Sequence, residues 1–228
     1  MLKKWEELPE ILKTEAVKPY YECLQKKRGS LLLKRIFDII ASLLMIVILS
    51  PLLLILSIII KLDSQGPVFF RQTRITKYGR EFRIFKFRTM VNNAEKLGTQ
   101  VTVGNDSRIT KVGSFIRNCR LDEIPQLFNI LLGDMSFVGT RPEVPKYVEQ
   151  YSAEMMATLL LPAGVTSQAS IRYKDEAELL ENAADADETY VNEILPEKMK
   201  YNLHDIENFS MSTELKTMFQ TLGAVLGK

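Results

Sequence analysis

Residues 36–60 read IFDIIASLLMIVILSPLLLILSIII, a run of twenty-five residues in which Asp38 is the only charged one. As an α-helix this run would be about 37 Å long, more than the roughly 30 Å hydrocarbon core of a bilayer. A cleaved signal peptide does not fit, because the run starts thirty-five residues into the chain and lacks a clear small-residue cleavage site. The sequence therefore predicts a membrane helix.

The Ser50-Pro51 pair lies near the middle of this run and predicts a kink. Proline removes one backbone hydrogen bond and clashes with the carbonyl four residues earlier, and Ser50 can bond a freed carbonyl. Basic residues flank both ends of the run: Lys26, Lys27, Arg28, Lys34, Arg35, Lys61, Arg71, Arg74 and Lys77. Because basic flanks favour the cytoplasmic side, we predict a re-entrant helix, kinked at Ser50-Pro51, with both ends in the cytoplasm. A proline-kinked helix that crosses the membrane is the alternative.

Charge is distributed unevenly along the chain, whose formal net charge is only +2. Residues 61–120 hold 13 Lys and Arg against 4 Asp and Glu, a local net charge of +9. Residues 172–214 hold 4 basic against 12 acidic residues, a local net charge of −8. The basic stretch predicts contact with an anion, whether nucleic acid, lipid headgroups or a phosphorylated substrate. The acidic stretch is interpreted as a solvated face.

Cysteine and histidine are too few for several kinds of site. Cys23 and Cys119 lie far apart with no CxxC spacing, which favours neither a disulfide framework nor a zinc site and fits a reducing cytosol. His204 is the only histidine, so a multi-histidine metal site is excluded and a Ser/His/Asp triad is not indicated. We interpret His204 as a structural or surface residue.

Three parts follow from this reading: residues 1–33 as an amphipathic or flexible segment, residues 34–62 as the re-entrant membrane helix, and residues 63–228 as a cytoplasmic domain. Aromatic and β-branched residues in VFFRQTRI and EFRIFKFRTM favour strands, joined by a hairpin at Tyr78-Gly79. Helical patterns follow over residues 114–121, 125–132, 145–160 and 176–187. The predicted fold class is α/β, mainly helical with a short β-hairpin, in a membrane-associated domain.

Residues 115–143 read FIRNCRLDEIPQLFNILLGDMSFVGTRPE and carry the candidate chemistry. Asp122 precedes an apolar helical pattern, so it can be the N-cap of that helix, and Glu123 can complement the helix dipole in the first turn. These structural roles are one interpretation of the two acids. The other depends on basic neighbours, which are Lys86, Arg88, Arg117, Arg120 and Arg141.

A helix N-terminus beside several guanidinium groups suits a phosphate or a pyrophosphate. Adjacent carboxylates in such a setting can hold Mg²⁺ against those phosphates. A carboxylate that stays ionised there can attack phosphorus and form an acyl phosphate, while the basic cluster neutralises the charge on the transferring group. Next to a membrane helix, this pattern predicts a substrate with a phosphate head and a lipid tail.

Four stretches together resemble a known family. They are KRIFDIIASLLMIVILSPLLL, GPVFFRQTRITKYGREFRIFKFRTM, RLDEIPQLFNILLGDMSFVGTRPE and LLLPAGVTSQASIRY. From about Lys34 to the C-terminus, the chain resembles the bacterial sugar transferase family, the monotopic phosphoglycosyl transferases that act on undecaprenyl phosphate. The four stretches together are specific for this family, although each one alone would be weak evidence.

The resemblance implies a role for each candidate residue. Asp122 resembles the nucleophile that takes the sugar phosphate from a UDP-sugar and expels UMP, and Glu123 its partner that assists Mg²⁺ binding or activates the lipid phosphate. Lys86, Arg117 and Arg141 resemble the phosphate-binding residues. Residues 63–228 would then be a catalytic domain on the cytoplasmic face of the bacterial inner membrane. The implied partners are UDP-sugar, polyprenyl phosphate and membrane lipid, with no nucleic acid and with a homodimer left open.

Some positions depart from the family pattern and leave the sugar undetermined. The common GPRP reads GTRP at residues 139–142, GVTSQAS at residues 164–170 replaces the usual GxTGWAQ run, and Asn202 stands where an acid is frequent. Residues 175–197 look like a subgroup insertion, and only the short catalytic form is expected. Two rival readings are a membrane-anchored scaffold that binds anionic lipid and a Mg²⁺-dependent lipid-phosphate hydrolase.

Overall fold

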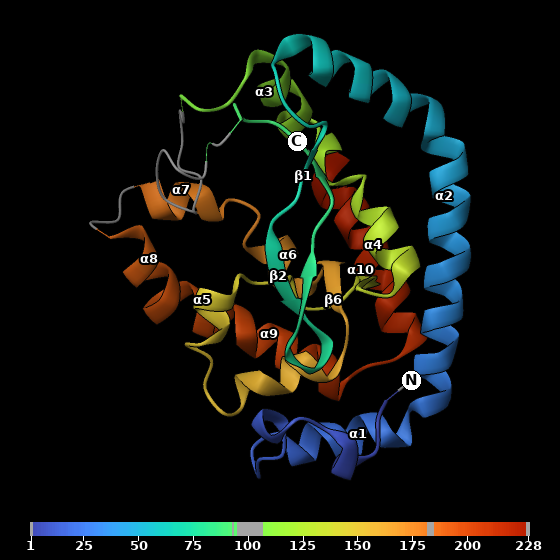
Figure 1. The fold of residues 1–228 in the computed structure, drawn as a ribbon. Helices are drawn as coiled ribbons and strands as arrows, with labels where there is room; N and C mark the ends of the chain where they lie inside the picture. Colours follow the sequence, from blue (N-terminus) through green and yellow to red (C-terminus); the bar gives the residue numbers. More distant parts are fainter. Residues whose placement is uncertain (1, 93, 95–106, 182–184, 227–228) are drawn as a thin grey trace.

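The computed structural model describes residues 2–92, 94, 107–181 and 185–226. It is mainly helical, with small two-stranded sheets, which confirms this part of the predicted fold class. The helices are α1 (Lys18–Lys26), α2 (Arg28–Asp63), α3 (Lys111–Asn118), α4 (Gln126–Leu132), α5 (Pro145–Val148), α6 (Gln168–Arg172), α7 (Glu176–Glu181), α8 (Ala186–Thr189), α9 (Leu195–Glu207) and α10 (Met211–Leu226). The strands are β1 (Phe69–Phe70), β2 (Thr73–Thr76), β3 (Arg80–Arg83), β4 (Lys86–Phe87), β5 (Met135–Val138) and β6 (Ala163–Thr166). Figure 1 shows α4 and α10 between the central strands and α2, with α5, α7 and α8 on the opposite side.

The hairpin predicted at Tyr78-Gly79 is confirmed. Strands β2 and β3 pair antiparallel, with Thr76 opposite Arg80. Tyr78 (φ 63°) and Gly79 (φ 74°) both adopt the left-handed conformation in the connecting turn, which glycine accepts without a steric penalty. Strand β4 pairs antiparallel with β1 and so fixes the backbone of Lys86.

Two predicted helices are interrupted. The helix predicted over residues 145–160 is divided into α5 and the 3-10 helix η6 (Met155–Leu160). The helix predicted over residues 176–187 is divided into α7 and α8, and residues 182–184 lie outside the described residues. The side chain of Asp185 accepts hydrogen bonds from the backbone of Asp187 and Glu188, so it starts a new helix at α8.

Strands β5 and β6 run parallel and hold the start of the loop that carries Arg141. The Gly139 amide donates to the Thr166 carbonyl at 2.9 Å, and the Gly164 amide donates to the Thr140 carbonyl at 2.8 Å. A Cβ atom on Gly164 would lie 2.2 Å from the Gly139 nitrogen. Only glycine therefore permits this approach of the two backbones.

Helix α2 is continuous through Pro51, and the Ser50 hydroxyl donates to the Val47 carbonyl at 2.8 Å. Figure 1 shows it bowed along one side of the domain and arching over the end where α3 lies. In the most apolar 18-residue stretch of this helix, only 11% is buried within the protein. The core helix of a soluble protein would be mostly buried, so α2 is a candidate membrane element. The re-entrant kink predicted at Ser50-Pro51 is not confirmed by this continuous helix.

The inner face of α2 changes from polar to apolar along its length. Near its start, the buried Lys34 donates to the Val138 carbonyl at 2.9 Å and pairs with Glu214 of α10. Near its end, Leu56 and Ile60 pack with Phe87 of β4, with Ile116 of α3 and with Leu121. The candidate membrane helix therefore rests directly on the segments that carry Lys86 and Asp122.

Residues 2–27 pack into the main hydrophobic core, a placement that the sequence left open between an amphipathic and a flexible segment. Leu12, Val17 and Leu24 are fully buried, in one cluster with residues of α9 and η6. The Lys27 ammonium and the Cys23 thiol both donate to the Glu207 carbonyl at the end of α9. This segment therefore fixes the start of α2 to the rest of the domain.

We expect Leu24→Ala to lower the free energy of unfolding by about 2–5 kcal/mol, because it leaves a cavity in a closed core. The Gln25→Ala variant, altered on the exposed side of the same helix, should lie within about 0.5 kcal/mol of wild type. Denaturation of the detergent-solubilised protein measures both. Equal stability of the two variants would show that residues 2–27 do not pack as described.

Candidate active site

Asp122 and Glu123 lie in η5 (Leu121–Glu123), a 3-10 turn between α3 and α4. Thr110 caps the start of α3, and Arg120, with a left-handed φ of 55°, turns the chain after that helix. The N-cap of α4 is Pro125. The interpretation of Asp122 as the cap of this helix is therefore wrong, because the chain is already helical from Leu121 onward.

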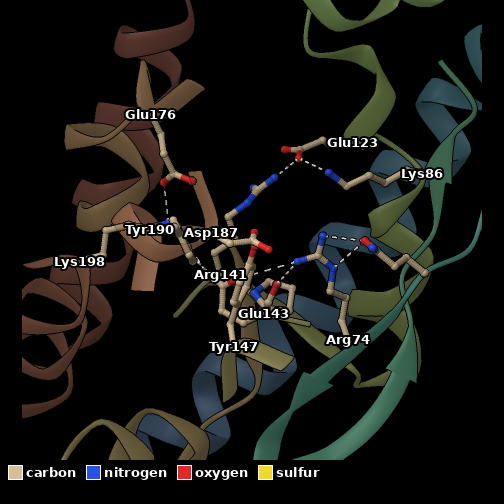
Figure 2. A network of polar contacts seen from close by, with 12 residues as sticks. Arg74, Lys86, Glu123, Arg141, Glu143, Tyr147, Glu176, Asp187, Tyr190 and Lys198 are labelled. Atoms are coloured by element: carbon tan, nitrogen blue, oxygen red, sulfur yellow. Dashed lines mark hydrogen bonds and ion pairs between the residues drawn. The ribbon is translucent and has the colours of Figure 1, made fainter. Parts of the chain in front are cut away.

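Glu123 joins three separate parts of the chain (Figure 2). Its Oε1 atom accepts a hydrogen bond from Lys86 Nζ at 2.7 Å and another from Arg141 Nη2 at 2.6 Å. Lys86 comes from β4 and Arg141 from the loop after β5, and the Glu123 side chain is only 17% exposed. The structure thus brings these three predicted site residues together.

The two adjacent acids have opposite electrostatic environments. Burial would raise the pKa of Glu123, but Arg141 and Lys86 outweigh burial and hold that pKa well below its ordinary value. Burial raises the pKa of Asp122, Lys86 and Arg117 oppose this, and the charge of Glu123 adds to it, so the pKa ends above its ordinary value. The charge on Glu123 is therefore well compensated, whereas the charge on Asp122 is not.

Two further basic residues named from the sequence have different positions. Arg117, in the last turn of α3, lowers the pKa of Asp122 and so belongs to the site by its charge. Arg88 is buried and donates to the carbonyls of Ile60, Ser64 and Pro67. Arg88 is thus not a phosphate ligand in this structure: it binds carbonyl groups at and beyond the end of α2.

A second group of charges continues from Arg141 away from Glu123 (Figure 2). The buried Glu143 accepts a hydrogen bond from the Tyr190 hydroxyl at 2.5 Å and lies 3.9 Å from Arg74 Nη1 and 4.0 Å from Lys198 Nζ. Lys198 in turn donates to Glu176 at 2.7 Å. These residues tie the acidic stretch to the loop that carries Arg141.

The interpretation of the acidic stretch as a solvated face is therefore wrong for part of it. Glu176 pairs with Lys198, and Asp187 accepts hydrogen bonds from Tyr147 and Lys146. The signal in the sequence is Lys198, which lies on the buried face of α9 beside Leu195 and Met199. A lysine at such a position requires a buried anionic partner.

Asp122 and Glu123 fit a Mg²⁺ ion that is bound together with a substrate phosphate. Among the residues that the structure describes, no group of three or more His, Cys, Asp or Glu could hold a metal alone. Mg²⁺ in phosphate-binding sites commonly takes one or two carboxylates and completes its shell with phosphate oxygens and water. The poorly compensated charge of Asp122 is what a bound cation would neutralise.

The arrangement suits transfer of a phosphoryl group. A carboxylate that can act as a nucleophile lies beside a carboxylate held by two cations, and Arg117 adds positive charge on the side of Asp122. Preorganised cations of this kind stabilise the charge that develops on a phosphoryl group during transfer. The apolar helix α2 packs on the same elements.

Comparisons with known proteins agree with this chemistry. A family model described as bacterial sugar transferase matches residues 29–228. The chain is 39% identical over 197 residues to the UDP-N-acetylgalactosamine-undecaprenyl-phosphate N-acetylgalactosaminephosphotransferase of Aeromonas hydrophila, an alignment that covers 85% of this chain and 44% of the relative. It is 36% identical over 196 residues to the UDP-glucose:undecaprenyl-phosphate glucose-1-phosphate transferase of Escherichia coli (strain K12), covering 84% of this chain and 39% of the relative.

The UDP-glucose:undecaprenyl-phosphate glucose-1-phosphate transferase of Caulobacter vibrioides is 34% identical to this chain over 196 residues, an alignment that covers 85% of this chain and 69% of the relative. The chain therefore spans less than half the length of the first two relatives and most of the third.

Proposed function

Because this chain belongs to the bacterial sugar transferase family, we propose that it transfers a sugar-1-phosphate from a UDP-sugar to undecaprenyl phosphate and releases UMP. The observation that carries the proposal is the contact of Glu123 with Lys86 and Arg141 beside Asp122. The relatives whose names state this reaction support it. The product would start the assembly of a capsule, O-antigen, exopolysaccharide or glycoprotein glycan.

The proposed reaction has two steps. In the first, a carboxylate oxygen of Asp122 attacks the phosphorus bonded to the sugar, the bond from this phosphorus to the bridging oxygen breaks, and UMP leaves with the bonding electrons. In the second, an oxygen of the lipid phosphate attacks the same phosphorus, and Asp122 regains its carboxylate as the acyl phosphate breaks. Each step forms one oxygen–phosphorus bond and breaks another.

The basic residues would change partners during this reaction. Lys86 and Arg141 share one oxygen of Glu123, so this carboxylate occupies the place of a phosphate oxygen between two cations. On substrate binding, both cations can move to the phosphate and free Glu123 to assist Mg²⁺ binding or activate the lipid phosphate. Mg²⁺, held by Asp122 and Glu123, would neutralise phosphate charge, and Arg117 would orient Asp122.

The membrane arrangement belongs to the same proposal. The outer side of α2 exposes many large apolar residues, and basic residues flank both of its ends. These features support a helix that enters the inner membrane, turns near Ser50 and Pro51 and returns to the cytoplasmic face, with the catalytic domain in the cytoplasm. Access of a protease to tags placed before and after α2, from each side of sealed vesicles, tests this topology.

We expect repeated turnover, measured as UMP released in excess over enzyme, with one UDP-sugar of a panel and only when undecaprenyl phosphate and Mg²⁺ are both supplied. EDTA should abolish turnover, because the phosphate charge would then lack its cation, and added Mg²⁺ should restore it. The measurement is UMP formation by the purified, detergent-solubilised protein, with the labelled lipid product separated by chromatography. Release of free phosphate or sugar phosphate would indicate a hydrolase, and release of no product from folded protein would contradict the proposal.

A further inference from the structure

Residues 176–198 are attached to the segment after Arg141 by two hydrogen bonds between side chains, and a third contact, between Glu176 and Lys198, lies within the stretch itself. Glu176 binds Lys198 at 2.7 Å, and the Tyr190 hydroxyl donates to Glu143 at 2.5 Å. The Tyr147 hydroxyl, in α5 after the Arg141 loop, donates to Asp187 at 2.6 Å. The described residues of this stretch are therefore held beside the loop from Arg141 to Glu143, and do not form a free acidic tail.

Glu176 is a partly exposed acid of this group and is therefore available to bind a ligand. Its side chain is 29% exposed, whereas that of its partner Lys198 is only 6% exposed. Glu123 has the largest effect in raising the pKa of Arg141, Glu143 a smaller one, and the charge of Glu176 the smallest of the three. Figure 2 shows Arg141 between Glu123 on one side and Glu176 on the other. The carboxylate thus lies near the site and is accessible to solvent.

The two sides of Arg141 suit different parts of a nucleotide-sugar. On the Glu123 side, Lys86 and Arg141 together provide positive charge for phosphate. On the Glu176 side, the carboxylates of Glu176 and Glu143 would repel a phosphate, but they suit hydroxyl groups, because an ionised oxygen is a strong acceptor. The sugar is bonded through one oxygen to the reacting phosphorus, so it must lie next to the residues that bind this phosphate.

We propose that Glu176 binds the sugar of the donor by accepting a hydrogen bond from a sugar hydroxyl, and so contributes to the choice of sugar. This inference rests on the proposed function of the same site. Arg141 would then separate the phosphate side from the sugar side. A site built to accept a hydrogen bond from one hydroxyl discriminates strongly against a donor that lacks it.

The test compares Glu176→Gln with Glu193→Gln, an exposed acid in the same stretch. Glu176→Gln should lower kcat/KM for the preferred UDP-sugar about 10- to 150-fold, the loss of one hydrogen bond to a charged acceptor. Inhibition by UMP, which has no sugar, should stay within about twofold of wild type. Glu193→Gln should match wild type in both. An unchanged kcat/KM in Glu176→Gln would overturn the proposal.

Lys198→Met separates sugar binding from a purely structural role of the ion pair. If Glu176 serves only to neutralise the buried Lys198, the Lys198→Met and Glu176→Gln variants should lose activity together, and Glu176→Gln should weaken UMP binding and lower Tm. That result would overturn the proposal. Retention of the donor preference by Lys198→Met, with its loss in Glu176→Gln, would support it.

A binding measurement keeps the inference distinct from the proposed reaction. The UDP-sugar of the panel that raises the Tm of wild-type protein most should raise it more than UMP does, and Glu176→Gln should remove this difference without changing the shift caused by UMP. This result can be obtained even if no turnover is found, which would contradict the proposed function alone. An equal Tm difference in wild type and Glu176→Gln would overturn the role of Glu176.

Discussion

Asp122→Asn is expected to lower kcat for sugar-phosphate transfer by at least roughly four orders of magnitude, the scale of loss when an essential nucleophile is removed. The amide that replaces the carboxylate has no charge and cannot form the acyl phosphate. The fold should persist, because burial raises the pKa of Asp122 and an uncharged side chain avoids this cost of burying a charge. Tm should therefore remain at or above the wild-type value.

The measurement combines UMP release with the mass of the intact protein after a rapid acid quench. Wild type incubated with UDP-sugar and Mg²⁺ but without lipid should gain the mass of one sugar phosphate, and Asp122→Asn should gain none. Glu149→Gln, an exposed acid outside the site, should behave as wild type. Full turnover by Asp122→Asn would exclude Asp122 as the nucleophile, and turnover of wild type without any covalent adduct would favour direct transfer to the lipid.

The parts of the site that the sequence predicts are those governed by local chemistry. Asp122 and Glu123 are neighbours in the chain, and the charge of the basic residues near them is enough to indicate a site for an anion. The hairpin at Tyr78-Gly79 is equally local, since its turn requires positive φ angles that glycine adopts without strain. In such cases a few adjacent residues contain the whole physical cause.

The parts that the sequence does not predict depend on contacts between distant segments. Arg88 lies two residues from Lys86 and has the same charge, yet it binds carbonyls beyond α2 while Lys86 binds Glu123. In a strand, residues two apart point to the same face, so the local pattern does not indicate that the two have different partners. The burial of Leu24 against α9 is a similar case, because a nine-residue amphipathic helix does not indicate what it packs against.

The acidic stretch shows how charge counting fails. A net of −8 over residues 172–214 is an average over exposed acids and over Glu176 and Asp187, which form ion pairs. The paired acids differ from the exposed acids because a lysine or a tyrosine of another element faces them. That property depends on tertiary structure, and Tyr190 and Lys198, both buried, are what attach this stretch to the site.

Arg141→Met is expected to lower kcat/KM by about a hundred- to a thousandfold, the usual loss when one preorganised donor to a developing charge is removed. Arg141 binds Glu123 at 2.6 Å and is drawn between Glu123 and Glu176, so its loss affects both the phosphate and the position of Glu123. Arg141→Lys keeps the charge but not the planar fork of donors, and it should recover only part of the activity. The matched control is Arg80→Gln, which breaks an ion pair between the exposed Arg80 of the hairpin and Asp134 after α4 and should change little.

Steady-state kinetics with varied UDP-sugar and varied lipid show where the loss arises. A role in stabilising the transferring phosphoryl group predicts a fall in kcat for Arg141→Met, with the KM for UDP-sugar changed much less. A purely structural role predicts a lower Tm and an equal loss in Arg141→Lys, because lysine could not replace a packed guanidinium either. Since Lys86 would still hold Glu123 in the variant, activity near the wild-type level would mean that Lys86 alone neutralises the phosphate and that Arg141 serves only to position its loop.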